Sequence, residues 1–429
     1  MKILKTGDDG FKEVLDRIVN RGSVQRADVE ASVRNIIEQV KEKGDEAVVK
    51  FTKKFDNYYL SPENIRVSKE EIENAYTSVG KKELGSLKIA AERIRKFHLH
   101  QIEKSWNYEE DGVLLGQIIK PLSIVGVYTP GGKASYPSSV LMNVIPAKVA
   151  GVEKVIMCTP PSGGRLNPYV LIAADIGGVD EIFSVGGAQA IAAMAYGTET
   201  IPRVDKIVGP GNVYVAEAKR MVFGDVDIDM VAGPSEILIV ADKNARADFI
   251  AADLLSQAEH DESAYPLMIT DSPELAVKVT EELEAQKKSL DRSEIIDKCL
   301  QKNCFCFVVR DIEEGIGIAN RIAPEHLELM VENPGTLLEK VKNAGAIFLG
   351  NYTPEAVGDY AAGPNHVLPT GGTARFSSPL GVYDFIKRSS LISFPEKNFR
   401  DIAPIVKDIA DVEGLTAHAK AVEIRMNDE

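Results

Sequence analysis

The sequence is short of basic charge: 64 Asp and Glu against 50 Lys and Arg give its 429 residues a formal net charge of −14. This balance argues against a nucleic-acid partner, because a phosphate backbone calls for a clustered basic face. No apolar run reaches about 18 residues, so we expect no membrane-spanning segment. Residues 1–15 contain no apolar segment after their lysines, so we expect no secretory signal.

Cysteine is also scarce. The four cysteines, Cys158, Cys299, Cys304 and Cys306, lack the spacing of a zinc site. Cys304 and Cys306 lie in an apolar, strand-like run, where we interpret them as buried thiols. We therefore expect a reduced, cytoplasmic protein. The length predicts two or three domains.

The apolar pattern changes along the chain. Residues 1–105 are mainly helical in pattern, with helices predicted over 27–55, from a capping box that begins at Ser68, and over 82–103. Beyond residue 112, strands and helices alternate, which is typical of βαβ units with helices on both faces of a parallel sheet. Predicted strands cover 113–119, 124–128, 155–158, 181–185, 206–208, 237–241, 267–270, 305–309 and 346–349. Predicted helices cover 140–150, 168–176, 188–196, 212–222, 246–260, 272–286 and 312–321.

The predicted fold is α/β, with two incomplete Rossmann-like lobes built on parallel sheets, one lobe inserted in the other. We predict a helical N-terminal arm (1–22), a first lobe (23–125 and 235–380), an inserted second lobe (126–234) and a helical C-terminal tail (381–429). The tail, with helices over 399–410 and 416–426, is too small to hold its own core. It must therefore pack on the lobes or on another subunit.

An acid and an imidazole stand side by side at Glu325 and His326. Pro324 predicts extended backbone at Ala323 and disfavours a helix there. From His326 onward the apolar residues alternate, which predicts a strand. An acid and a base at the entry to this strand could divide two proton transfers between them. The alternative is that Glu325 caps a turn and His326 is an ordinary surface residue.

Three glycine-rich turns, 126–132, 185–190 and 208–213, separate strands from helices. Anionic ligands bind at such strand ends, where helix N-termini point outward. None of the three has the dinucleotide-binding pattern of glycines followed by a distant acid. The turns therefore favour a nucleotide-sized ligand only slightly over simple tight turns.

Other polar residues are candidate ligands. Gln257 and His260 are three apart on a predicted helix and share one face, which alone is a weak metal signal. The loop 358–375 holds an acid and a histidine, and a loop of this length inside a compact domain is usually functional. Glu413 and His418 in the tail have an ordinary alternative as helix-surface residues.

Taken together, the segments VGGAQAIAA, VGPGN, AGPSE, SQAEH, PEHLE and GDYAAGPNH resemble the histidinol dehydrogenase family over nearly the whole chain. The resemblance implies NAD-dependent, four-electron oxidation of L-histidinol to L-histidine through L-histidinaldehyde, the last steps of histidine biosynthesis. It also implies one zinc ion per subunit and a homodimer in which the tail of one subunit enters the site of the other.

The resemblance assigns roles to individual residues. Glu325 and His326 would be the catalytic acid–base pair. The zinc ligands would be Gln257, His260, Asp359 and His418. The substrate contacts would be Ser235, Gln257, His260, His326, Asp359, His366, Glu413 and His418. The NAD contacts would be Tyr128, Gln189 and Asn212.

The chemistry of these residues agrees with the implied roles. Nitrogen and oxygen ligands without thiolate suit zinc, and manganese or cobalt could substitute. His326 could take the hydroxyl proton and Glu325 could activate a water for the second oxidation. No cysteine lies near these segments, which argues against a thiohemiacetal route. A metal-dependent binding or sensing protein and a zinc hydrolase remain alternatives. A pure binder has no need of the acid–base pair, and the ligand set leaves little room for a hydrolytic water.

Overall fold

The computed structural model describes residues 1–22, 27–61, 64–131, 136–231 and 233–427. The chain forms two compact units, the first from Met1–Gln101 with Leu122–Phe385 and the second from Ile102–Pro121 with Ile386–Glu429. Within the described residues, no helix is both long and apolar enough to cross a bilayer. The two units are described in turn.

A six-stranded, fully parallel sheet forms one core of the first unit, in the order β1-β11-β10-β9-β12-β13. Its strands are β1 (Lys2–Lys5), β9 (Glu236–Ala241), β10 (Tyr265–Thr270), β11 (Phe305–Val308), β12 (His326–Met330) and β13 (Ala346–Leu349). The central strand β9 is buried on both faces: Ile237 and Ile239 belong to one apolar cluster, Leu238 and Val240 to the other. A continuous apolar run is what a parallel strand covered on both sides requires.

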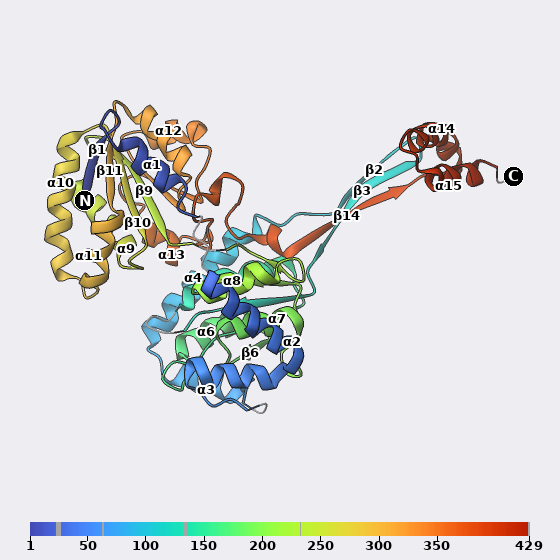
Figure 1. Cartoon of the computed structure of the whole chain (residues 1–429), viewed down its shortest axis with the longest axis horizontal. Helices are drawn as coiled ribbons and strands as arrows, with labels where there is room; N and C mark the ends of the chain where they lie inside the picture. The colour runs from blue at the N-terminus through green and yellow to red at the C-terminus, as the bar shows by residue number, and fades with distance from the viewer. Residues whose placement is uncertain (23–26, 62–63, 132–135, 232, 428–429) are drawn as a thin grey trace. The chain divides into compact units, whose positions relative to one another are not determined.

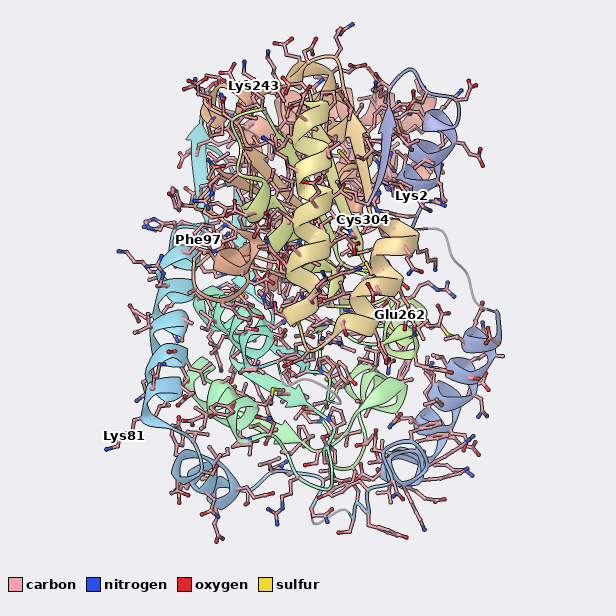
Figure 2. All side chains as sticks on the ribbon, turned by 90° about the vertical axis from the view of Figure 1, so that its left-hand side faces the viewer. Lys2, Lys81, Phe97, Lys243, Glu262 and Cys304 are labelled. Carbon is pink, nitrogen blue, oxygen red and sulfur yellow. The ribbon has the colours of Figure 1, made fainter. Side chains whose placement is uncertain are left out.

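Helices cover both faces of this sheet (Figure 1). One face packs against α9 (Ala247–Ala258), α10 (Pro273–Gln286) and α11 (Ser293–Asn303), and the other against α1 (Phe11–Val19) and α12 (Ile312–Ile322). In Figure 2, α10 and α11 lie in front of the six-stranded sheet. Cys304 is labelled there and lies between the end of α11 and the start of β11. All four cysteines are buried and free, which confirms the interpretation of Cys304 and Cys306 as buried thiols.

A five-stranded parallel sheet forms the other core of the first unit, in the order β6-β5-β4-β7-β8. Its strands are β4 (Ile124–Tyr128), β5 (Lys154–Cys158), β6 (Glu181–Phe183), β7 (Lys206–Val208) and β8 (Asp227–Ile228). One face packs against α2 (Ala27–Asp56), α7 (Gly187–Tyr196) and α8 (Val213–Val222). The other packs against α3 (Lys69–Thr77), α4 (Lys81–Leu99), α5 (Pro137–Ala150) and α6 (Pro168–Gly177).

The second unit is a three-stranded antiparallel sheet followed by two helices. Its strand order is β14-β3-β2, with β2 (Trp106–Glu110), β3 (Val113–Pro121) and β14 (Ile386–Ser393). The helices are α14 (Glu396–Val412) and α15 (Thr416–Met426), which pack on each other. The first unit also holds α13 (Glu355–Tyr360) and the 3₁₀ turns η1 (Lys287–Ser289), η2 (Pro334–Lys340), η3 (Thr373–Arg375) and η4 (Val382–Phe385).

The predicted α/β fold with two parallel sheets is confirmed, and most predicted elements are present. Three features differ from the expectation. The segment expected as a helical arm contributes β1 to the edge of the six-stranded sheet. Helices α2 to α4, grouped with the first lobe by sequence, pack on the five-stranded sheet. The segment expected as a purely helical tail begins with β14, whose partner β3 lies far back in the chain. The domain boundaries themselves stay a prediction.

Candidate active site

The predicted acid–base pair lies at the end of the six-stranded sheet where its parallel strands begin. Helix α12 ends at Ile322, Ala323 has a φ of 50°, and β12 begins at His326. The expectation of extended backbone at Ala323 was wrong. That residue instead closes the helix in a left-handed conformation, and its N–H donates to the carbonyl of Ala319 at 2.8 Å. Glu325 and His326 sit where this turn enters the strand, as predicted.

Glu325 is buried, with 7% of its surface exposed. Its Oε2 accepts the backbone N–H of Glu236 at 2.8 Å and lies 3.7 Å from Nδ1 of His326. Burial raises the pKa of Glu325 to about 8; the charge of His326 opposes this rise, and those of Glu236 and Glu355 add to it. A carboxyl that titrates near neutral pH can both take and give a proton, as general acid–base catalysis requires.

His326 is held in one tautomer. Its Nδ1 lies 2.9 Å from the carbonyl oxygen of Glu236, which can only accept, so Nδ1 carries a proton and the lone pair of the neutral ring is on Nε2. Nε2 lies 3.7 Å from Oδ1 of Asp359 and has no hydrogen-bond partner among the described residues. Burial lowers the pKa of His326, but the carboxylates of Glu355, Glu325 and Asp359 together outweigh it, so the pKa is well above its ordinary value. The basic nitrogen therefore faces Asp359.

A further carboxylate, Glu355, lies beside the imidazole. Glu355 opens α13, is 2% exposed, and has Oε1 3.6 Å from Nδ1 of His326. Ligand atoms of His326, Glu355 and Asp359 all lie within 4.8 Å of one another, a spacing that could hold a metal ion. Burial raises the pKa of Glu355 to about 7. The cluster of His326, Glu355 and Asp359 shares Asp359 with the zinc ligand set that the family resemblance implies.

Gln257 and His260 lie at the end of α9. Gln257 is completely buried, and its Oε1 has no hydrogen-bond partner in the part of the chain that the structure describes. His260 follows the last turn of the helix, where its Nδ1 lies 2.9 Å from the carbonyl oxygen of Ser256. That contact occupies one ring nitrogen of His260 and leaves Nε2 available as a ligand.

Asp359 and His366 meet in the loop that the sequence marked as functional. Nδ1 of His366 lies 2.9 Å from the carbonyl oxygen of Asp359. Burial favours a higher pKa for the Asp359 carboxyl, but the nearby imidazoles of His326, His366 and His260 outweigh it and lower the pKa. Burial lowers the pKa of His366. The structure thus brings these predicted residues of the first unit into one site.

Two predicted site residues belong to the second unit. Glu413 follows the last residue of α14, and His418 lies in the first turn of α15. Both side chains are exposed in that unit. Their predicted roles beside the residues of the first unit stay a prediction.

The predicted NAD contacts lie at the five-stranded sheet. Tyr128 ends β4 and is 3% exposed, and its hydroxyl oxygen accepts the backbone N–H of Gly187 at 3.0 Å. Gln189, in the first turn of α7, is buried, and neither polar atom of its amide has a hydrogen-bond partner among the described residues. Asn212 is exposed and caps α8 with its Oδ1. An unpartnered amide at a helix N-terminus is a feature that a ligand could satisfy.

The glycines of these turns have packing reasons of their own. A Cβ on Gly209 would lie 2.1 Å from the carbonyl oxygen of Tyr128, and one on Gly186 would lie 2.4 Å from Cβ of Pro160. Gly132 of the first turn and Ala232 of the AGPSE segment lie outside the described residues. The glycine pattern alone therefore does not decide between a ligand cradle and tight packing.

Besides Glu355, two residues next to the acid–base pair escaped the sequence reasoning. Glu236 touches both members of the pair, and Arg21 binds the carboxylate of Glu236 from 215 positions away in the sequence. Glu236 carried a weak signal, since it follows the predicted substrate contact Ser235. Arg21 carried none, because no local pattern marks a contact over such a separation.

Comparisons with known proteins agree with the motifs. The family model described as histidinol dehydrogenase matches residues 19–426. The histidinol dehydrogenase of Aquifex aeolicus is 55% identical over 425 residues, 99% of each chain, and that of Syntrophotalea carbinolica is 50% identical over 429 residues, 100% of each. A crystal structure of histidinol dehydrogenase from Elizabethkingia anophelis is 38% identical, with a TM-score of 0.93 over 99% of this chain and 98% of that one. The chain therefore belongs to the histidinol dehydrogenase family, whose members are oxidoreductases.

Proposed function

We propose that this chain oxidises L-histidinol to L-histidine through L-histidinaldehyde, with two NAD per turnover and one zinc ion per subunit, as the last steps of histidine biosynthesis. Membership of the family supports the substrate. The observation that carries the mechanism is the buried pair: a carboxyl with a pKa near neutrality beside an imidazole with one fixed, unpartnered nitrogen. Two proton-transfer groups suit two successive oxidations.

In the first oxidation, Nε2 of His326 takes the proton of the substrate hydroxyl as a hydride passes from the carbinol carbon to NAD. The hydrogen bond from Nδ1 to the carbonyl of Glu236 keeps the lone pair on Nε2. Neighbouring carboxylates stabilise the imidazolium that forms, which makes His326 a stronger base than an isolated imidazole.

In the second oxidation, Glu325 takes a proton from a water that adds to the aldehyde carbon, and protonated His326 returns its proton to the carbonyl oxygen, which gives the hydrate and a neutral imidazole. The hydrate then loses its hydride to the second NAD, with Nε2 of His326 again accepting the hydroxyl proton. Because burial raises the pKa of Glu325 to about 8, this carboxyl is mostly ionised only above that pH, so this step should become faster as the pH rises toward that value. Substrate, water and two NAD account for the atoms and electrons of both steps.

The residues present fit a zinc site. Gln257, His260, Asp359 and His418 would hold the ion. The buried Oε1 of Gln257 lacks a hydrogen-bond partner among the described residues, and its neighbour His260 has one ring nitrogen uncommitted. Nitrogen and oxygen donors without thiolate suit a borderline divalent ion. When bound, the ion would orient the imidazole and amine of the substrate and place positive charge beside the acid–base pair.

The five-stranded sheet is the proposed NAD side. Gln189 supports this role, because its buried amide lies in the first turn of α7 without partners among the described residues. Tyr128 accepts the N–H of Gly187, the first residue of the same helix. Asn212 presents its exposed side chain at the start of α8.

We further propose a homodimer in which the C-terminal helices of one subunit complete the site of the other. An exposed apolar row on α14, Ile405, Val406, Ile409 and Val412, supports contact with a second copy. This arrangement would bring Glu413 and His418 to the partner's substrate, as the family resemblance implies. Four free thiols agree with a reducing, cytoplasmic location.

The test is the absorbance of NADH when purified protein, histidinol, NAD and zinc are mixed. We expect NADH to form, activity to disappear when a chelator removes the metal, and activity to return with added zinc. Folded, zinc-loaded protein that binds histidinol without forming NADH would refute the proposal and favour a binding protein.

A further inference from the structure

We propose that Arg21 and Glu236 are positioning residues for the acid–base pair: Arg21 locks the carboxylate of Glu236, and Glu236 sets the orientation of both Glu325 and His326. The inference rests on the proposed function of that pair. Neither Arg21 nor Glu236 is proposed to contact the substrate or NAD.

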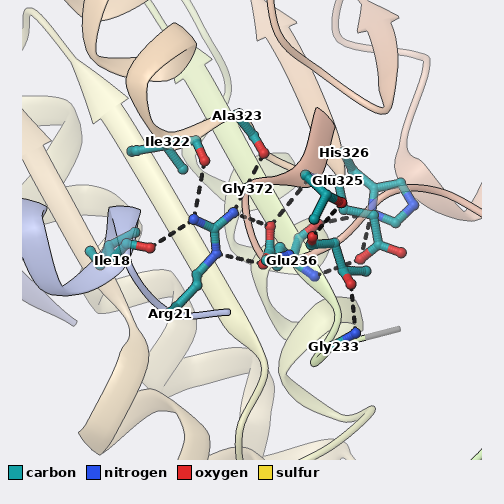
Figure 3. A network of polar contacts seen from close by, with 12 residues as sticks. Ile18, Arg21, Gly233, Glu236, Ile322, Ala323, Glu325, His326 and Gly372 are labelled. Atoms are coloured by element: carbon teal, nitrogen blue, oxygen red, sulfur yellow. Dashed lines mark hydrogen bonds and ion pairs between the residues drawn. The ribbon is translucent and has the colours of Figure 1, made fainter. Parts of the chain in front are cut away.

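Arg21 follows α1, and its side chain is almost completely buried, with 1% exposed. Its Nε and one terminal nitrogen form a two-pronged ion pair with the two oxygens of Glu236. The other terminal nitrogen donates to the carbonyls of Ile18 at 2.7 Å and Ile322 at 3.1 Å (Figure 3). A planar guanidinium suits such a fork, which the single ammonium of lysine cannot reproduce. Arg21 thus joins the end of α1 to the end of α12, directly before the acid–base pair.

Glu236 contacts both members of the pair through three different groups. Its backbone N–H donates to Oε2 of Glu325 at 2.8 Å, and its carbonyl accepts from Nδ1 of His326 at 2.9 Å. Its Oε2 accepts the backbone N–H of Glu325 at 3.4 Å, and its Oε1 accepts that of Gly371 at 2.7 Å. These contacts converge on Glu236 in Figure 3. One residue therefore fixes where the Glu325 carboxyl lies and which nitrogen of His326 is basic.

The two carboxyls make Arg21 necessary. Glu236 is 1% exposed and lies against Glu325, which is also buried. A buried carboxylate needs a positive partner, and breaking a buried ion pair by removing that partner leaves an uncompensated charge. Without Arg21, the carboxylate of Glu236 would lie beside the Glu325 carboxyl with no fork to hold it in place. The groups of Glu236 that contact the pair would then shift.

A purely structural role is the competing explanation, since breaking a buried ion pair by removing one partner is strongly destabilising. The double variant Arg21→Met/Glu236→Gln separates the two. It removes both charges, leaves no buried ion unpaired, and should regain the thermal stability that Arg21→Met loses. A structural role predicts that kcat recovers with stability. A positioning role predicts that kcat stays low, because the fork that fixes Glu236, and with it the backbone groups that orient the pair, is gone.

The experiment measures kcat, the KM for histidinol and the thermal midpoint for the wild type, Arg21→Met, Arg21→Lys and the double variant, all loaded with zinc. Arg321→Met is the matched control, because Arg321 on α12 pairs with Asp16 on α1 at the surface, at 3.4 Å, and joins the same two helices away from the site. Arg21→Lys keeps the charge but not the fork, so it should fold even if Arg21→Met does not.

We expect the double variant and Arg21→Lys to lose about 10- to 100-fold in kcat, the loss that follows a small misplacement of a catalytic group, with KM changed less than about twofold. The control should match the wild type. A double variant whose kcat returns to the wild-type value, or an Arg21→Lys variant with unchanged kcat, would overturn the inference. A wild type that forms no NADH would instead refute the proposed function, a result that the same assay distinguishes.

Discussion

Replacing Glu325 with glutamine tests the proposed mechanism and its electrostatics together. Glutamine keeps the size of the side chain and removes its ionisation. The carboxyl has a pKa of about 8 in the folded protein because of burial, against 4.5 for an ordinary glutamate. Between these pH values the unfolded chain is ionised at this position and the folded chain is still protonated.

The sign of the effect on stability follows from that difference. The free energy of unfolding that the protonated carboxyl contributes is complete below about pH 4.5 and is lost as the pH rises to about 8. A rise in pKa from 4.5 to about 8 corresponds to at most about 5 kcal/mol. The wild type should therefore lose more stability than Glu325→Gln as the pH rises across this window. Glu339→Gln, a change at an exposed glutamate, should follow the wild type.

Urea denaturation at several pH values measures this difference, and product analysis measures the chemistry. Loss of the general base should slow oxidation of the aldehyde by about 100-fold or more, so Glu325→Gln should accumulate L-histidinaldehyde when given histidinol. Its rate should also lose the increase toward about pH 8. Parallel stability curves for the variant and the wild type, together with unchanged aldehyde oxidation, would refute the reasoning.

Three further predictions concern other parts of the site. His326→Gln should lower kcat by about 100-fold or more in steady-state assays while leaving zinc content unchanged, and an unchanged kcat would remove it as the base. Gln257→Ala should lower the zinc bound per subunit, measured by elemental analysis after dialysis, whereas full zinc occupancy would remove Gln257 from the ligand set. Refolding an equal mixture of His326→Gln and His418→Asn chains should restore about a quarter of the wild-type activity, because half of the dimers contain one intact shared site. No recovery in dimers that have mixed would place His418 in its own subunit's site.

The parallel sheets could be predicted from sequence because burial leaves a local pattern. After Glu236, the strand β9 is an unbroken apolar run, the pattern of a strand that is covered on both faces. Strand β1 could not be predicted, because its four residues are mostly exposed at a sheet edge and carry no alternation. Strand β14 was missed because its pairing with β3 joins segments that are distant in the sequence.

The site shows the same division. Glu325 and His326 are neighbours, so a short segment was enough to mark them. Ala323 departs from the preference of a residue before proline because it closes α12 and hydrogen-bonds within that helix. Arg21 and Glu355 reach the pair only through tertiary folding, from segments with no chemical pattern of their own.

The number of NADH molecules formed per histidinol consumed tests the central claim most directly. Zinc-loaded protein should form two NADH for each histidinol and release L-histidine as the product. No NADH, or one NADH with the aldehyde as the end product of the wild type, would contradict the account.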